Sequence, residues 1–463
     1  MTILLALAAL TVLLLIGTAA GKAVGMTRWG VPEALLAGAL GLLIAPSGPL
    51  PLLPQGVIDF WSELPLVLLT LVFGALLLGK PLPRIGALWR PVASQLLLAL
   101  TLAFGQFMVG GVAVLLVLGP LMGAPPVMAA LIEVAYEGGH GSAAAMGPAY
   151  ARLGLESGES LGLALATVGL LTATLVGGLV VVLGRSRRWL LASTLPMAQE
   201  LNQPLTAALP AIAATASREP PPTTRVSLAD LIQGLKVWLP NLALTGTAVL
   251  LGVLMLGCLQ LLSARLGGGF ALVIDGLPVF PLALLGSLLV RLVLETTSRA
   301  HWVTPAVQSR VGTLAADLLI TAATACLDLA LLGQQWLPLT VLAVAGLLWN
   351  VAVVLLLAPR ILPPNWFERG LVEFGQATGV AASGLLLLNM VDPADVGDAL
   401  TPFSIKQLIL QPFIAGGVIT VIAPLAISGW GLGSWTGFCL GLVLLWGSLG
   451  LWLGRSHPRA PQP

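Results

Sequence analysis

Apolar runs about as long as a bilayer is thick recur along the whole chain. The sequence of 463 residues is 57% hydrophobic and only 9% charged, and its mean hydropathy is +1.00. A soluble domain of average composition carries roughly a quarter charged residues, whereas a membrane-spanning helix needs about 20 consecutive apolar residues. These features predict an all-α polytopic membrane protein.

The apolar runs fall into two sets of five, separated by a polar, proline-rich segment. The expected spans of the first set are residues 2–20, 31–46, 62–79, 93–119 and 160–183. Those of the second set are 237–264, 277–294, 313–333, 337–358 and 405–428. The predicted organisation is a first five-span repeat (1–184), a linker (185–236), a second five-span repeat (237–428) and an extra C-terminal span with a basic tail (429–463).

A polar, glycine-rich stretch interrupts the first half between its fourth and fifth spans. Residues 132–147 read IEVAYEGGHGSAAAMG and place Glu133, Glu137 and His140 around a cluster of glycines. Glycines weaken a helix, and an acidic residue costs about 2.5–3.5 kcal/mol at the centre of a membrane helix. Transporters use such broken helices to build binding sites. The pattern predicts a re-entrant loop at 126–152.

A second stretch of this kind, EFGQATGVAAS at 373–383, lies at the same place in the second half. It predicts a second re-entrant loop at 366–390. A gapless alignment of the two stretches pairs Glu137 with Glu373, Gly139 with Gly375, His140 with Gln376, Ser142 with Thr378 and Ala145 with Ala381. The segments 32–43 and 281–292 are also alike. The chain is therefore expected to contain an internal repeat of roughly 240 residues, with its central feature present twice.

Basic residues are distributed unevenly between the two predicted faces of the membrane. If each broken stretch enters and leaves on one side, all 21 Lys and Arg residues except Arg152 and Arg265 fall on one face. The positive-inside rule makes that face cytoplasmic. We therefore expect the N-terminus outside, with the central loop and the C-terminus in the cytoplasm. Five crossings per half would also invert the second repeat relative to the first, as in secondary transporters.

Two opposed re-entrant tips would meet near the middle of the membrane and form the binding site. Helix N-termini at the tips suit a carboxylate, while acidic side chains and helix C-termini suit a sodium ion or a proton. The expected substrate-binding residues are Gly138, Gly139, His140, Gly141, Ser142, Gly375, Gln376 and Thr378. The expected ion-coupling residues are Glu137, Glu373 and Glu133.

Four polar residues each have two interpretations from the sequence. His140 is either a site residue or a hydrogen-bonded structural residue, and Glu133 lies either in the site or at the outer surface. Asp317 and Asp328 lie within a predicted span or at its end. An intramembrane acid is a functional candidate by default, but span boundaries predicted from sequence can differ from the true ones by a few residues.

The sequence contains no pattern typical of a metalloprotease, serine hydrolase or ATP-driven pump, so an enzyme is not expected. His140 has no further histidine at metal-ligand spacing, which argues against a bound metal or other cofactor beyond a coupling ion. The three cysteines lie singly in apolar runs, where no disulfide is expected. The scattered basic residues do not indicate a nucleic-acid partner, whereas membrane lipids and a small solute are expected partners.

At EGGHGSAAAMGPAYARLG, residues 137–154, the chain resembles the bacterial sodium/glutamate symporter family. Further similar segments are Pro32 with Glu33, PLMG at 120–123 and TVGLLTATLVGG at 167–178. The resemblance implies two inverted five-span repeats, two opposed re-entrant loops, an elevator-like movement, sodium coupling and a homodimer in the bacterial inner membrane. It places Gly138, Gly139, His140, Gly141 and Ser142 in the first motif of the family.

The leading functional hypothesis is an ion-coupled symporter of a small organic anion or amino acid, glutamate-like by resemblance, with sodium as the expected coupling ion. A first alternative is a cation/proton exchanger in which Glu137 and Glu373 hold the transported ions. A second alternative is a membrane scaffold or sensor that transports nothing.

Overall fold

Helices make up the framework of the computed structural model, which describes residues 2–26, 32–79, 89–190, 228–266, 277–327, 329–392 and 397–455, with Ile274 and Asp395. Within these residues there is no strand. Eight of the described helices are long and apolar enough to cross a membrane. The prediction of an all-α polytopic membrane protein is confirmed at this level.

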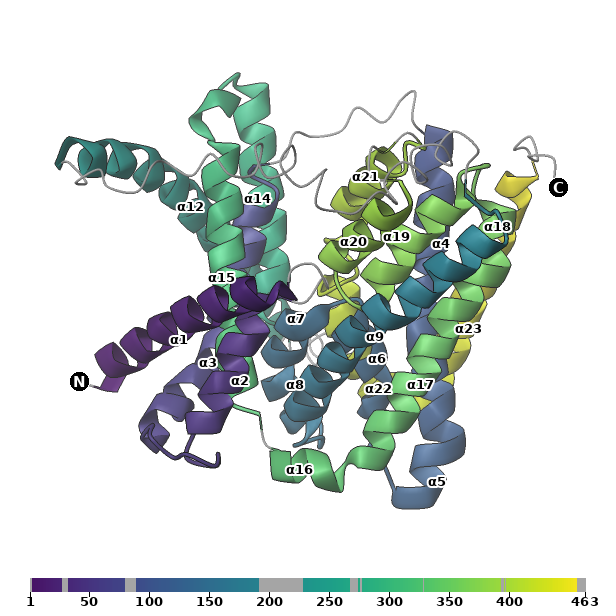
Figure 1. The fold of residues 1–463 in the computed structure, drawn as a ribbon, viewed down its shortest axis with the longest axis horizontal. Coiled ribbons are helices and arrows are strands. Elements are labelled where there is room, and N and C mark those ends of the chain that lie inside the picture. The colour runs from purple at the N-terminus through teal and green to yellow at the C-terminus, as the bar shows by residue number, and fades with distance from the viewer. Residues whose placement is uncertain are drawn as a thin grey trace.

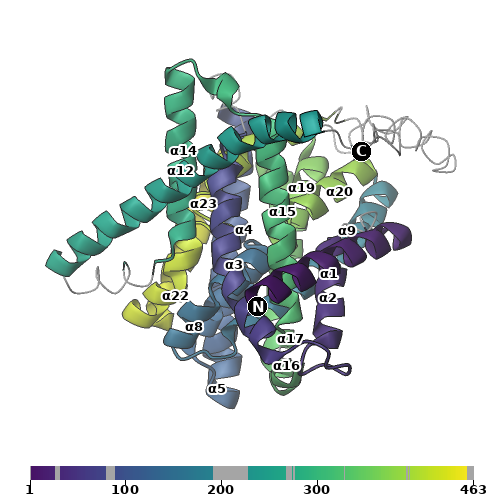
Figure 2. The same cartoon turned by 90° about the vertical axis from the view of Figure 1, so that its left-hand side faces the viewer.

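Six helices pack together as a first group, on the left in Figure 1 and facing the viewer in Figure 2. They are α1 (Thr2–Val24), α2 (Glu33–Ile44), α3 (Gln55–Leu76), α12 (Leu228–Leu266), α14 (Val279–Thr296) and α15 (Pro305–Ala325). Helices α3 and α15 lie side by side at its centre, with α2 against α15 and α14 against both α3 and α12. This group therefore combines helices from both halves of the chain.

The remaining helices form a second group, on the right in Figure 1. Its members from the first half are α4 (Trp89–Ala113), η2 (Val114–Leu118), α5 (Gly119–Met122), η3 (Pro126–Ala130), α6 (Leu131–Tyr136), α7 (Gly139–Ala145), α8 (Gly147–Arg152) and α9 (Gly158–Ser186). The second half contributes α16 (Leu329–Gln334), α17 (Trp336–Ala352), η5 (Val353–Leu357), α18 (Ala358–Ile361), α19 (Trp366–Thr378), α20 (Ala381–Val391), α21 (Leu400–Leu410), α22 (Val418–Trp430) and α23 (Leu432–Gly454).

Two long helices of the second group share an unusual internal feature. Each contains a five-residue π-helix, η2 in the first half and η5 in the second, and a proline follows at Pro120 and Pro359. Proline cannot donate the regular helical hydrogen bond, and a wide turn before it accommodates the ring. Helices α4 and α17 pack together, and in Figure 1 their C-terminal ends, α5 and α18, point to the bottom and the top. The two helices therefore run antiparallel.

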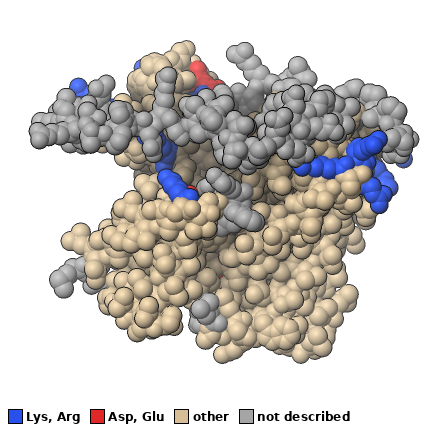
Figure 3. Space-filling view, in the orientation of Figure 1, with Lys and Arg blue, Asp and Glu red and all other residues tan. Residues whose placement is uncertain are grey.

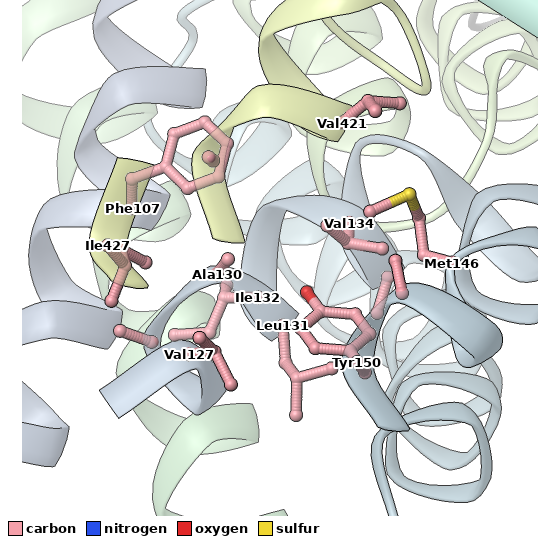
Figure 4. Packing of buried hydrophobic residues seen from close by; sticks show 14 of the residues in the cluster. Phe107, Val127, Ala130, Leu131, Ile132, Val134, Met146, Tyr150, Val421 and Ile427 are labelled. Carbon is pink, nitrogen blue, oxygen red and sulfur yellow. The ribbon is translucent and has the colours of Figure 1, made fainter. Parts of the chain in front are cut away.

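The hydrophobic core of the second group surrounds the first broken stretch. Residues of η3 and α6 pack against α4, α8 and α22, as Figure 4 shows for Phe107, Tyr150 and Ile427. Every residue of α6 is buried, including Glu133. Because apolar neighbours enclose this segment on several sides, its polar side chains must find partners inside the protein.

The surface fits a hydrocarbon environment. Large apolar side chains are exposed along the long helices, for example on α1, α12 and α23. On the face drawn in Figure 3, the visible Lys, Arg, Asp and Glu atoms lie in the upper part, and the lower part shows none. Charge is thus concentrated toward one end of this face.

Several predicted boundaries differ from the structure. The run 405–428, predicted as one span, consists of α21 and α22 with a break at 411–417. The predicted span 313–333 is replaced by α15, which ends at Ala325, because the chain turns before α16. Helix α2 has 12 residues and is shorter than a full span. Helix α12 begins at Leu228, inside the predicted linker, most of which (191–227) lies outside the described residues.

Candidate functional site: a buried polar cluster at three helix breaks

The first helix break lies where the sequence predicts it. Helix α6 ends at Tyr136, Glu137 caps it, and α7 begins at Gly139. Gly139 has φ +69°, a left-handed conformation that side chains other than glycine adopt at a cost. A second bend at Met146 separates α7 from α8. The glycine cluster therefore interrupts the helix inside the helical core.

The second break lies further along the chain than the gapless alignment predicts. Helix α19 continues through Gly375 and Gln376 to Thr378, and the break falls at Gly379 and Val380. Gly375 is needed for packing: a Cβ there would lie 2.5 Å from Cα of Gly384 in α20. The prediction that Gly375, Gln376 and Thr378 form the tip is wrong, because the break begins after Thr378. Gly375 allows a close contact between helices and does not form a turn.

The two breaks lie close together. A Cβ built on Gly139 would be 3.5 Å from the Cγ1 atom of Val380, which is ordinary van der Waals contact. The third break, at 411–417, joins them: Gly416 faces Ser142 so closely that a Cβ on Gly416 would collide with the serine hydroxyl. Segments far apart in the sequence thus meet at one place, which we call the break cluster (residues 137–142, 379–383 and 411–417).

Buried charges flank the break cluster on α19 and α21. The Nζ atom of Lys406 lies 2.9 Å from Oε2 of Glu373, and both side chains are fully buried. Gln95 of α4 donates to Oε1 of Glu373 at 2.8 Å and accepts a hydrogen bond of 2.8 Å from Nε of Arg369. A chain of charged hydrogen bonds therefore connects Arg369, Gln95, Glu373 and Lys406.

Glu133 is tied to the third break. Its Oε1 atom accepts hydrogen bonds from the Thr420 hydroxyl at 2.8 Å and from the backbone N–H of Ala415 at 3.2 Å. Ala415 has φ +58°, so the carboxyl group accepts from a strained backbone turn. Glu133 is completely buried, which excludes the interpretation of it as a residue at the outer surface.

Glu137 has a different environment. Its side chain is only 4% exposed, and Oε2 has no hydrogen-bond partner among the described residues. It lies within electrostatic range of Lys406, Glu373 and Glu133. The structure thus brings the three predicted ion-coupling glutamates together.

Other buried polar atoms near the breaks also have no hydrogen-bond partner within the described part of the chain. They are Oγ of Ser142, Oε1 of Gln376, Oγ of Ser383 and Oε2 of Glu133. An unsatisfied buried polar atom costs about 1–3 kcal/mol, so native proteins rarely keep several of them in one place without a reason. Their concentration on two broken stretches indicates a place where a polar ligand can bind.

His140 and Thr378 are bonded within the protein. Nε2 of His140 lies 3.0 Å from the hydroxyl of Thr167 in α9. That hydroxyl donates to the carbonyl of Leu163 at 3.0 Å, so it accepts from an N–H of the imidazole. The hydroxyl of Thr378 accepts a hydrogen bond from Asn350 at 3.0 Å. His140 belongs to the break cluster and Thr378 borders it, and their hydrogen bonds hold the surrounding helices in place.

Two amide side chains satisfy the end of α19. Gln106 and Asn350 both donate to the carbonyl oxygen of Ala377, at 2.6 Å and 2.9 Å. They also bond to each other at 3.1 Å. Because the last carbonyl groups of a helix lack partners within it, these amides from α4 and α17 allow α19 to end inside the protein.

Four residues at the site are not predicted from the sequence: Lys406, Arg369, Gln95 and Thr420. Lys406 and Arg369 are predicted at the cytoplasmic face with the other basic residues, whereas both are buried against α4. Lys406 and Arg369 therefore do not count as cytoplasmic charges when the positive-inside rule is applied. The sequence contains one indication of their role: each is a basic residue within a predicted span or broken stretch.

Two acidic residues whose role the sequence leaves undecided, Asp317 and Asp328, are not among these contacts. Asp317 is half-buried on α15 in the first group, and Asp328 lies outside the described residues. Within the described residues no group of three or more His, Cys, Asp and Glu side chains has the arrangement of a metal site.

No family model, curated protein or solved structure matches this chain.

Proposed function

We propose that this protein is an ion-coupled secondary symporter of a small organic anion or amino acid, with glutamate as the first solute to test and sodium as the first coupling ion. The observation that carries the proposal is the close approach of two helix breaks from different halves of the chain, since a Cβ built on Gly139 would lie 3.5 Å from Val380. Transporters build their sites from such discontinuous helices. Here the breaks also gather buried carboxyl, hydroxyl and amide groups.

The paired features of the two halves support an inverted repeat. The segments VLLVLGP at 114–120 and VVLLLAP at 353–359 both form a π-helix followed by proline, and the helices that contain them are antiparallel. Each is followed by a broken stretch, 126–152 and 366–390. We assign both stretches as re-entrant loops that enter from opposite faces, as the inverted-repeat plan requires.

The charges beside the breaks provide a physical basis for ion coupling. Among the described residues, Glu133, Glu137 and Glu373 are buried beside the breaks, together with the cations Arg369 and Lys406. If every carboxyl group were ionised, acids would outnumber bases by one in a low-dielectric region. An organic anion would bind poorly unless a cation or proton entered with it. Transport of the anion would therefore require the coupling ion.

Solute contact is assigned to the atoms that have no partner. The N-terminus of α20, an 11-residue helix, presents free N–H groups to a carboxylate. Ser383, Ser142 and Gln376 add hydroxyl and amide groups around it. Glu137, whose Oε2 has no hydrogen-bond partner, is assigned to the coupling ion.

The two helix groups give the proposed movement a physical form. Helix α7 carries part of the break cluster and packs against α3 and α15 of the first group. At this boundary a Cβ on Gly141 would lie near Leu69 and Leu319, both apolar. An apolar boundary can slide without breaking charged contacts, so we assign the first group as the scaffold and the second as the moving part of an elevator-like carrier.

The membrane setting extends the proposal. We assign a bacterial inner membrane, a cytoplasmic central loop and C-terminus, an external N-terminus and a homodimer. The exposed apolar side chains of α1 and α12 would face lipid or the second copy.

A cation/proton exchanger is the second candidate, and the excess of buried acids over buried bases favours it. Thermal stabilisation separates the two, because a ligand that binds the native state raises its apparent stability. The purified protein would be heated with a panel of amino acids and carboxylates, in sodium or in choline. A solute shift that needs sodium supports the symporter. A shift with sodium or pH alone supports the exchanger, and no shift contradicts both.

A further inference from the structure

The ion pair between Lys406 and Glu373 is fully buried within the protein. Besides the contact of 2.9 Å with Glu373, Nζ of Lys406 donates to Oε1 of Gln407 at 2.8 Å. It also lies 4.7 Å from the centroid of the Phe403 ring, within the range of a cation–π contact. The ammonium group therefore has a carboxylate, an amide oxygen and an aromatic face around it.

The two acidic residues at the breaks are not equivalent in this respect. Glu373 has a tethered ammonium group and a hydrogen bond from Gln95. Glu137 has neither: Oε2 has no hydrogen-bond partner, and Lys406 reaches it only through a longer electrostatic interaction. The neighbouring acid, Glu133, is bonded through Oε1 to Thr420 and Ala415, and its Oε2 also has no hydrogen-bond partner.

We propose that Lys406 is a tethered cation that neutralises Glu373 in place of a dissociable ion, which confines the exchangeable coupling ion to Glu137 and Glu133. This inference rests on the proposed ion-coupled function and specifies where its ion binds. A charge fixed to the protein does not leave during transport. The second half therefore contributes a permanent ion pair, and the first half contributes the exchangeable site.

The test compares three purified variants by thermal unfolding: Lys406→Met, the double variant Lys406→Met/Glu373→Gln, and Lys236→Met. The last replaces an exposed lysine and is the matched control. Each is measured in choline chloride, in increasing sodium or potassium chloride at constant ionic strength, and at decreasing pH.

The variant Lys406→Met is expected to unfold roughly 5 °C or more below the wild type in choline. Sodium, potassium or a lower pH should restore most of this loss, because a dissociable cation or proton then neutralises Glu373. The double variant should unfold near the wild-type temperature and gain no more from cations than the wild type does, because no uncompensated charge remains. Lys236→Met should match the wild type throughout.

Two results would overturn the inference. One is a Lys406→Met variant whose loss of stability is unchanged by cations and pH. The other is a double variant as unstable as the single one. If Lys406→Met yields no folded protein, a folded double variant supports the inference and an unfolded double variant contradicts it. None of these readouts needs solute flux, so a protein without transport but with these responses would refute the proposed function and leave the tethered cation standing.

Discussion

The Oε1 atom of Glu133 accepts a hydrogen bond of 2.8 Å from the hydroxyl of Thr420, across 287 positions of sequence. The bond joins the first broken stretch to a break between α21 and α22. Ala415 of the same break donates its backbone N–H to the same oxygen. The carboxyl group thus fixes the shape of a segment contributed by the other half of the chain.

Thr420→Val tests this link. Valine keeps the shape of threonine but removes the donor, so a buried carboxyl group loses one of its two partners. The expected loss of stability is about 1–3 kcal/mol, measured by thermal or denaturant unfolding in detergent. The control is Thr340→Val, where an exposed hydroxyl donates to the carbonyl of Trp336 in its own helix. That change should have an effect within about 0.5 kcal/mol; equal effects of the two changes would refute the link.

Glu137→Gln and Glu373→Gln should have different effects on stability, although the two residues occupy matching positions in the sequence alignment. Removing the charge of Glu137 breaks no ion pair, so stability should change little while the ion dependence of binding or transport changes. Removing the charge of Glu373 leaves Lys406 buried without its partner, at a cost of about 3–5 kcal/mol. Unfolding temperatures measured with and without sodium distinguish them. Equal stabilities with unchanged sodium and pH dependence would contradict both roles.

Gly375→Ala should separate α19 from α20. The new Cβ would lie 2.5 Å from the backbone of Gly384, and such overpacking costs about 1–3 kcal/mol. Ligand stabilisation should also weaken, because the break at Gly379 would shift. Gly178→Ala in α9 is the matched control, since a Cβ there meets nothing within 4 Å and alanine favours a helix. A Gly375→Ala variant as stable as this control would show that the close contact is absent.

Single cysteines test the proposed orientation in a background without Cys258, Cys326 and Cys439. A cysteine at Arg225, in the central loop, should react with an impermeant thiol reagent only from the cytoplasmic side. A cysteine at Arg152, exposed at the end of α8, should react only from outside. Labelling of intact cells compared with inverted vesicles provides the readout. The opposite pattern would reverse the orientation and remove the support from the positive-inside argument.

The sequence predicts the fold class and the first break well, because both depend on local pattern. Runs of apolar residues report the long helices directly, and a glycine cluster with Glu137 marks the turn after α6. The second break was misplaced because Gly375 looks like a helix breaker in isolation. Its role in close packing depends on Gly384, and no local pattern shows that contact.

The ion pair of Lys406 and Glu373 could not be predicted for the same reason. A lysine at the edge of an apolar run is normally taken to face the cytoplasm. Only the fold shows that α21 places it against α19, 33 positions earlier in the chain. The break at 411–417 had a local signal, Pro412 with Gly416 and Gly417 in an apolar run, but the length of that run was compatible with one span.

Solute uptake into proteoliposomes is the direct test of whether this protein is an ion-coupled symporter. The purified protein would be reconstituted, and uptake of labelled glutamate, or of the carboxylate that stabilises it best, would be followed under an inward sodium or proton gradient. We expect accumulation that needs one of these gradients and loses its normal ion dependence in Glu137→Gln. Folded protein that accumulates no solute of the panel under either gradient would contradict it.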